Sequence, residues 1–231
     1  MVAPQDTQLA RRLVEQLGGR YSLELGIDVD HGEAEIERWA LAATLFGNRI
    51  SAAIAVRTYR ALAHAGVRTI ADAGARSWEE LVALLDAGGY ARYDGRTADR
   101  LCDFAATLRS DGGAARLGKR FARPEELEAA LDALPGWGPV TVRLFLRELR
   151  GVWPSAEPPL DESAVAAAEH LRLAGAPDLA WLARAAGDAE LDRRDLETAL
   201  VRLAHRHRRG YAGCAGGLAC LALEPLPTDR R

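Results

Sequence analysis

The chain has 231 residues, of which 48% are hydrophobic, which is enough to fill the core of one large or two small domains. Its formal net charge is −3, so any surface that binds nucleic acid must be a local basic patch. Three cysteines are too few for a disulfide framework, and neither a signal peptide nor an apolar run of membrane-spanning length is visible. We therefore expect a cytoplasmic protein with no membrane partner.

Helical signals dominate the chain, because Ala, Leu, Glu and Arg recur with apolar spacings of three and four and β-branched alternation is missing. Ser77 and Glu80 have the spacing of a capping box, and Pro124 before two glutamates fits a helix start. Residues 18–32 could form a loop, a short strand or a helix. The expected helices cover residues 6–17, 33–46, 51–65, 77–87, 96–110, 124–133, 138–150, 161–173, 178–187 and 192–208. The pattern predicts an all-α fold.

The most informative segment, residues 124–150, reads as two helices joined by a tight turn, Leu134-Pro135-Gly136-Trp137-Gly138-Pro139. The glycines permit positive φ and close approach to a ligand, and a proline suits a first helical turn. Free amides at the start of the second helix would form a phosphate site. An ordinary helix-turn-helix corner has the same local pattern, and Trp137 could either pack inward or rest against a sugar-phosphate surface.

The turn resembles the helix-hairpin-helix motif, Leu-Pro-Gly-hydrophobic-Gly followed by a helix, at every position. A loop with three prolines follows at residues 151–160, and Asp161 comes directly after it. The order of hairpin, Gly/Pro loop and aspartate is similar to that of the helix-hairpin-helix/Gly-Pro-Asp DNA glycosylases, such as endonuclease III. Residues 39–49 and 89–99 also resemble family segments, so the likeness covers roughly residues 33–175.

The resemblance implies two helical lobes with the active site in the groove between them. We expect a central bundle over residues 33–151 and a second lobe formed by residues 1–32 and 152–231. The implied activity is base-excision repair, in which a damaged or mismatched base is flipped out of double-stranded DNA and removed by hydrolysis. The family motifs do not define which base is excised. We expect a monomer that associates with the nucleoid when acting.

Asp161 takes the position of the family's catalytic carboxylate. Cleavage of the base-sugar bond builds positive charge on the deoxyribose, and a fixed anion can stabilise it or orient a water molecule. An aspartate before a helix is also a preferred N-cap, and the two roles are compatible. The residues that follow, Glu162-Ser163-Ala164, replace the Thr-His-Val of many relatives, which leaves the surroundings of the carboxylate undefined.

Bifunctional relatives carry a lysine nucleophile early in the second hairpin helix, where this chain has Val140. The resemblance therefore implies a monofunctional glycosylase. Two alternatives stay open: a bifunctional lyase that uses Lys119, the only lysine, and a non-catalytic DNA-binding protein in which Asp161 only caps its helix.

Many relatives bind an iron-sulfur cluster through four cysteines near the end of the chain. Only Cys214 and Cys220 lie in the comparable region, so we expect no cluster and no cofactor. A mixed metal site that includes His205 and His207 is conceivable, but we interpret these histidines as part of a basic helix end and expect no metal.

The resemblance also indicates DNA-facing residues. Asn48 matches the position of a side chain that fills the space left by the flipped base, although Gly47-Asn48 equally fits a helix-ending turn. Arg49 would contact the opposite strand or a phosphate. Further phosphate candidates are Arg143, Arg147, Arg150, Arg206, Arg208 and Arg209. The aromatic residues that could stack on a flipped base are Trp39, Phe46, Tyr90 and Tyr93.

Overall fold

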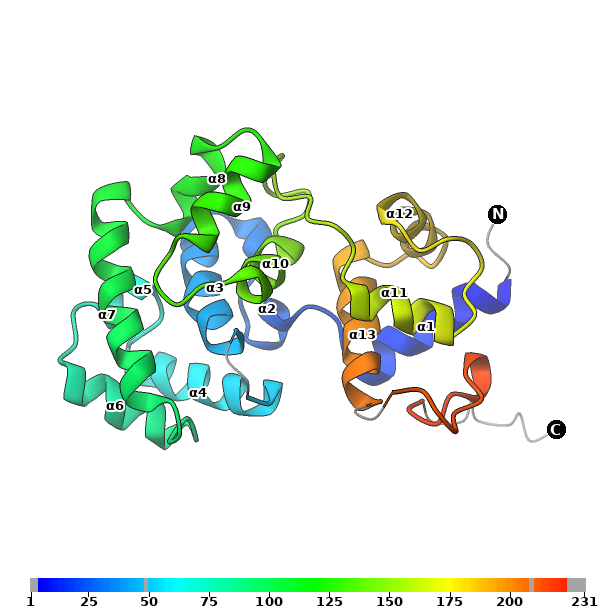
Figure 1. The fold of residues 1–231 in the computed structure, drawn as a ribbon, viewed down its shortest axis with the longest axis horizontal. Coiled ribbons are helices and arrows are strands. Elements are labelled where there is room, and N and C mark those ends of the chain that lie inside the picture. The colour runs from blue at the N-terminus through cyan, green and yellow to red at the C-terminus, as the bar shows by residue number, and fades with distance from the viewer. Residues whose placement is uncertain (1–3, 48–49, 208–209, 224–231) are drawn as a thin grey trace. The chain divides into compact units, whose positions relative to one another are not determined.

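The computed structural model describes residues 4–47, 50–207 and 210–223 (Figure 1). Within these ranges the regular structure is helical, and an isolated β-bridge joins Arg150 and Trp153. The expected all-α fold is therefore confirmed. None of the helices in the described ranges combines the length and apolar character that a bilayer crossing requires.

The chain divides into two compact units. The end unit comprises Met1–Tyr21 and Pro159–Arg231, and the central unit comprises Ser22–Pro158. The sequence led us to expect boundaries after residues 32 and 151, so residues 22–32 and 152–158 fall in the central unit instead of the end unit. Both stretches are bonded to the central unit, because the Ser22 amide donates to Glu148 and Arg150 pairs with Glu157.

The end unit is built around α13 (Arg193–Arg206), which packs against α1 (Pro4–Leu17), α11 (Glu162–His170) and α12 (Leu179–Asp188). A short 3-10 helix, η3 (Gly217–Ala219), lies in its C-terminal segment. Helices α11, α12 and α13 each begin behind an aspartate N-cap, which satisfies an amide of the first turn. The buried leucines of this unit's core include Leu13, Leu182, Leu196, Leu200 and Leu203.

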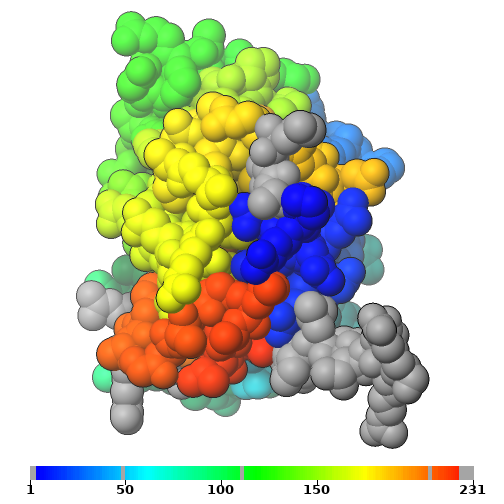
Figure 2. Space-filling view, turned by 90° about the vertical axis from the view of Figure 1, so that its right-hand side faces the viewer, coloured from blue at the N-terminus to red at the C-terminus, as the bar shows by residue number. Residues whose placement is uncertain are grey.

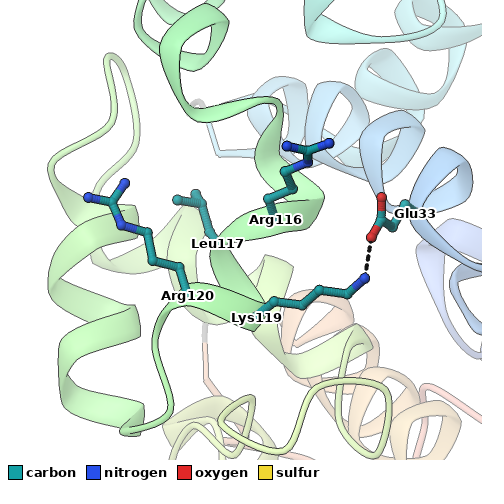
Figure 3. A pocket seen from close by; sticks show the side chains of 5 residues that line it. All are labelled: Glu33, Arg116, Leu117, Lys119 and Arg120. Carbon is teal, nitrogen blue, oxygen red and sulfur yellow. Dashed lines mark hydrogen bonds and ion pairs between the residues drawn. The ribbon is translucent and has the colours of Figure 1, made fainter.

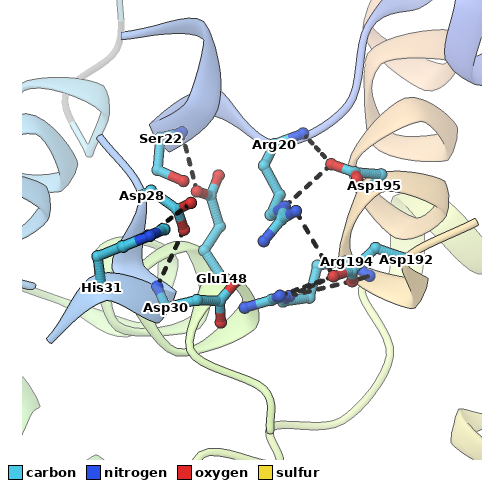
Figure 4. Close-up of polar contacts among 9 residues, drawn as sticks. All are labelled: Arg20, Ser22, Asp28, Asp30, His31, Glu148, Asp192, Arg194 and Asp195. Atoms are coloured by element: carbon cyan, nitrogen blue, oxygen red, sulfur yellow. Dashed lines mark hydrogen bonds and ion pairs between the residues drawn. The ribbon is translucent and has the colours of Figure 1, made fainter. Parts of the chain in front are cut away.

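A polar cluster joins the turn after α1 to the start of α13 (Figure 4). Arg20 Nε lies 3.1 Å from Asp195 Oδ1, and Arg20 Nη2 lies 3.5 Å from Asp192 Oδ2. Arg194 Nη2 also binds Asp192 Oδ2, at 2.6 Å. Because Asp192 caps α13 as well, these contacts connect the N-terminal segment to the central helix of the end unit.

The central unit is built around α3 (Glu33–Phe46), whose residues 39–45 are all buried. A helix that is apolar on every side is expected at the centre of a bundle. The elements before and after it are α2 (Tyr21–Glu24), η1 (Val29–His31), α4 (Ala52–His64), α5 (Ile70–Ala73), α6 (Trp78–Ala87), α7 (Asp94–Asp111), η2 (Ala114–Arg116), α8 (Leu117–Arg120), α9 (Pro124–Asp132) and α10 (Pro139–Glu148).

Polar contacts of the central unit fix its first segment. The buried carboxylate of Glu148 accepts the Ser22 amide at 2.9 Å, and His31 lies 2.9 Å from Asp28 (Figure 4). The Trp39 indole donates to the Phe145 carbonyl at 3.2 Å, which holds α10 against α3. The segment that the sequence left open thus forms two short helices, α2 and η1.

Candidate nucleic-acid interface

The predicted hairpin is formed by α9, the turn at residues 133–138 and α10. The Trp137 amide donates to the Leu134 carbonyl at 3.0 Å, and Gly136 between them has φ of +80°. Proline at the second position and a glycine with positive φ at the third are the features of a type II turn. The turn therefore explains why Pro135 and Gly136 occur in this order.

The two large apolar residues of the motif point into the central unit. Leu134 and Trp137 are 6% and 7% exposed. The Trp137 ring meets Phe145 edge-on at 4.8 Å and Phe104 at 5.4 Å, and its indole donates to Thr44 Oγ1 at 2.9 Å. Trp137 is thus an anchor that holds the turn against the core, which decides between the two orientations that the sequence left open.

The start of α10 presents backbone to solvent. Gly138 is the N-cap, with φ of −152° and no side-chain cap, and the first helical bond runs from the Val142 amide to the Gly138 carbonyl. The amides of Val140 and Thr141 precede this bond and so have no partner within the helix. Val140 is 73% exposed. Such an uncapped N-terminus is suited to bind an anion.

Neither a positive φ nor a steric contact requires a glycine at position 138, although glycine is a better N-cap than alanine. The φ of Gly138 lies in the extended region, which any residue can adopt, and a Cβ built on it meets nothing within 4 Å. Gly136 differs, because its φ is positive and a Cβ would lie 2.7 Å from Arg100 Cδ. The absence of a side chain at Gly138 leaves the backbone at the start of α10 open to close approach.

A groove of about 570 Å³ lies beside the hairpin in the central unit. One wall is the first part of α7, with Tyr93, Arg96 and Arg100, and the other is the chain from Gly136 to Thr141. Arg96 is exposed and Arg100 is half-buried. Sequence reasoning did not identify these arginines. Their spacing of four places them on one face of the helix, but nothing in the sequence indicated that this face meets the hairpin.

Asn48 and Arg49 lie outside the described residues. The residue before them, Gly47, ends α3 and lines the same groove. A Cβ on Gly47 would lie 1.8 Å from Thr141 Oγ1, so the end of α3 touches the first turn of α10.

The expected phosphate contacts need correction. Arg143 on α10 is exposed, but Arg147 and Arg150 are 4% and 2% exposed and do not offer their charges at the surface. The chain turns back after α10, and Arg150 Nη1 lies 3.3 Å from Glu157 within that loop. Arg206 of the end unit is exposed and donates to the Ala222 carbonyl. Arg208 and Arg209 lie outside the described residues.

Two of the aromatic candidates for base stacking are core residues. Trp39 is 0% exposed, and Tyr90 is 1% exposed and donates its hydroxyl to the Leu45 carbonyl. Neither can stack on a base from solvent, so this expectation was wrong for both. Phe46 and Tyr93 are half-buried, and Tyr93 lines the groove beside the hairpin.

Asp161 lies in the end unit, half-buried at the start of α11. Its Oδ1 accepts the Ser163 amide at 2.8 Å, and its own amide donates to Oε1 of the buried Glu197 at 3.3 Å. These bonds make Asp161 an N-cap. Among the described residues its Oδ2 has no hydrogen-bond partner. The cap bond therefore holds the carboxylate in place and leaves one of its oxygens available.

Lys119 lies in the central unit beside an open pocket of about 500 Å³, which is also lined by Arg116, Leu117 and Arg120 (Figure 3). The Lys119 side chain is 74% exposed and forms an ion pair with Glu33. The hydrogen bond and the charge from Lys119 lower the pKa of the Glu33 carboxyl. A lyase nucleophile must be free to attack the sugar, whereas Lys119 is held in this ion pair.

Searches against known proteins returned no match: no family model matches the chain, and neither does any curated protein.

Proposed function

We propose that this protein is a monofunctional DNA glycosylase that hydrolyses the bond between a damaged or mismatched base and its deoxyribose. The observation that carries the proposal is Gly138, which neither its φ nor any steric contact requires to be a glycine and which leaves the backbone at the start of α10 open. Backbone amides at such a position bind phosphate without reading the base sequence. Arg96 and Arg143, both exposed, would add positive charge to the contact with double-stranded DNA.

Asp161 is the proposed catalytic residue. Its cap bonds leave one carboxylate oxygen uncommitted, and that oxygen would stabilise positive charge on the sugar or orient the attacking water molecule. Val140 offers no amine at the position of the family's lyase lysine. The product would therefore be an abasic site rather than a cleaved strand.

A second candidate function, DNA binding without catalysis, is favoured by the capping role of Asp161. The change Asp161→Asn separates the two, because asparagine is an equally good N-cap but cannot carry the charge. A glycosylase should lose at least about a hundredfold of its excision rate and keep its DNA affinity. Asp178→Asn, at the N-cap of α12, is the matched control and should leave excision unchanged.

The assay is single-turnover excision from duplex oligonucleotides with uracil or thymine mispairs, alkylated purines, hypoxanthine or oxidised bases. Each reaction is analysed with and without alkali, because a monofunctional enzyme cleaves the strand only after alkali. No release from any lesion would refute the enzymatic proposal. A borohydride-trapped adduct that disappears in Lys119→Ala would instead establish the lyase alternative.

A further inference from the structure

The C-terminal segment of the end unit, residues 210–223, has little regular structure and is held by arginines from three helices or their ends. Arg12 donates to the Leu218 carbonyl at 3.3 Å, Arg172 to Ala215 at 3.1 Å and Arg206 to Ala222 at 3.2 Å. Figure 2 shows the segment in orange to red, packed beside the yellow and blue helices of this unit. The segment is thus docked on the ends of α11 and α13.

Four metal-binding side chains converge where the segment meets these helix ends. They are His170 at the end of α11, His207 just after α13, and Cys214 and Cys220 in the segment. Their ligand atoms all lie within 4.8 Å of one another, and His207 Nε2 is 3.2 Å from Cys220 Sγ. Four ligands around one zinc ion are separated by about 3.3–3.8 Å, because metal-ligand distances are about 2.0–2.3 Å. A contraction on the order of 1 Å would close the shell.

A second observation also points to a ligand. His170 Nε2 is buried and has no hydrogen-bond partner among the described residues, whereas buried polar atoms are normally paired. Tyr211 stacks on the His170 ring at 4.2 Å, and the backbone of Gly216 packs so closely that a Cβ would lie 2.2 Å from the His170 carbonyl oxygen. The imidazole is therefore held in place next to the two cysteines.

The Cys214 sulfur accepts a hydrogen bond from the Leu221 amide at 3.2 Å. An amide that points at a ligand atom is one of the outer contacts that orient ligands at metal sites. A cavity of about 620 Å³ opens beside Cys214 and His207 and offers an ion a route from solvent.

We propose that His170, His207, Cys214 and Cys220 bind one structural zinc ion. Two thiolates and two imidazoles in a tetrahedral shell are a ligand set that Zn²⁺ prefers, and four protein ligands leave no open position for catalysis. A cluster that needs four cysteines cannot form here, because only two lie at the site. A cluster of the Rieske type holds two cysteines on one iron and two histidines on the other, whereas His207 Nε2 lies 3.2 Å from Cys220 Sγ, as two ligands of a single ion do. This proposal replaces the expectation, drawn from the sequence, that the chain binds no metal. His170 is the proposed ligand that the sequence did not indicate.

The proposal does not depend on the glycosylase activity, but it concerns the same helix. Helix α11 carries the Asp161 cap at its start and His170 at its end. At about 1.5 Å per residue, its nine residues span roughly 13 Å. Zinc would therefore fix the far end of the helix that presents the proposed catalytic carboxylate.

The test is metal analysis of the full chain, purified under reducing conditions with zinc in the growth medium, by inductively coupled plasma mass spectrometry. About one equivalent of zinc per chain is expected. Cys214→Ser and His170→Ala should lose most of it, whereas Cys102→Ser and His64→Ala, which change the same residue types outside the cluster, should retain it. Removal of zinc by a chelator should lower the melting temperature by about 5–10 °C.

A spectroscopic measurement keeps the proposal testable if a variant folds poorly. Cobalt added to the metal-free chain should show the intense visible bands of tetrahedral coordination and a thiolate-to-metal charge-transfer band. Cys214→His should still bind cobalt, with a weaker charge-transfer band. Three results would each overturn the assignment. The first is iron together with acid-labile sulfide, the second is a Cys214–Cys220 disulfide in the reduced preparation, and the third is a zinc content that neither ligand variant changes.

Discussion

The two glycines of the hairpin should respond to alanine in opposite ways. Gly136 has φ of +80°, where an alanine is disfavoured by about 1–2 kcal/mol. Its new methyl would also displace the Arg100 side chain, whose Cδ lies 2.7 Å away, but a flexible side chain can move. For a chain of this length each kcal/mol lowers the melting temperature by about 2–4 °C. Gly136→Ala should therefore melt about 2–8 °C lower than the wild type.

Gly138→Ala should leave stability nearly unchanged. The methyl meets nothing within 4 Å, and the backbone stays in the extended region. Alanine is a poorer N-cap than glycine. It also stabilises the fold by about 0.4–1 kcal/mol, because it lowers the conformational entropy of the unfolded chain, and the two effects offset each other. The same methyl would stand where the proposed DNA phosphate meets the amides of α10. Loss of one charge-assisted contact, about 1.5 kcal/mol or more, corresponds to at least tenfold weaker binding.

The assay is fluorescence anisotropy with an undamaged duplex at one fixed salt concentration, paired with thermal unfolding of each variant. Gly187→Ala is the control, because Gly187 in α12 also has room for a methyl and lies outside the proposed interface. If Gly138→Ala binds DNA within twofold of the wild type, the hairpin backbone does not contact phosphate. If Gly136→Ala is as stable as the wild type, the assigned turn is wrong.

Two further substitutions test contacts inside each unit. Trp137→Phe removes the bond to the buried Thr44 hydroxyl, so urea unfolding should show a loss of about 1–2 kcal/mol; equal stability would mean that the indole is not anchored there. Burial acts to raise the pKa of Asp192, but bonds from Arg194 and the charges of Arg20 and Arg194 lower it below its usual range. Asp192→Asn should therefore lose on the order of 1 kcal/mol at pH 7. The stabilisation is present above the unfolded-state pKa of about 3.9 and is lost as pH falls through the folded-state value, so a difference that persists at lower pH would contradict it.

The long helices were predictable because their apolar residues repeat over several turns and their starts carry recognisable caps. Ser77 and Glu80 do form the expected capping box at α6. The short helices α2, α5 and α8 were not predicted, since four residues are too few to display a helical period. The hairpin turn could likewise be read from Pro135 and Gly136, because a type II turn places strict demands on both positions.

The side-chain environment was less predictable than the backbone. Arg147 and Arg150 looked like surface charges, but the loop after α10 covers Arg150 and pairs it with Glu157. The proposed zinc site was not predicted because His170 and His207 are far apart in sequence, and only the packing of α11 beside α13 brings them together. A pattern within a single helix does not contain that information.

The contact between Gly47 and Thr141 makes the hairpin's position a property of the whole central unit. There is no room for even one carbon atom beyond the Gly47 backbone, so the end of α3 and the start of α10 must shift together. A larger residue at position 47 would require a smaller one at position 141. We therefore expect the two positions to vary together among relatives, although about two thirds of the central unit separates them along the chain.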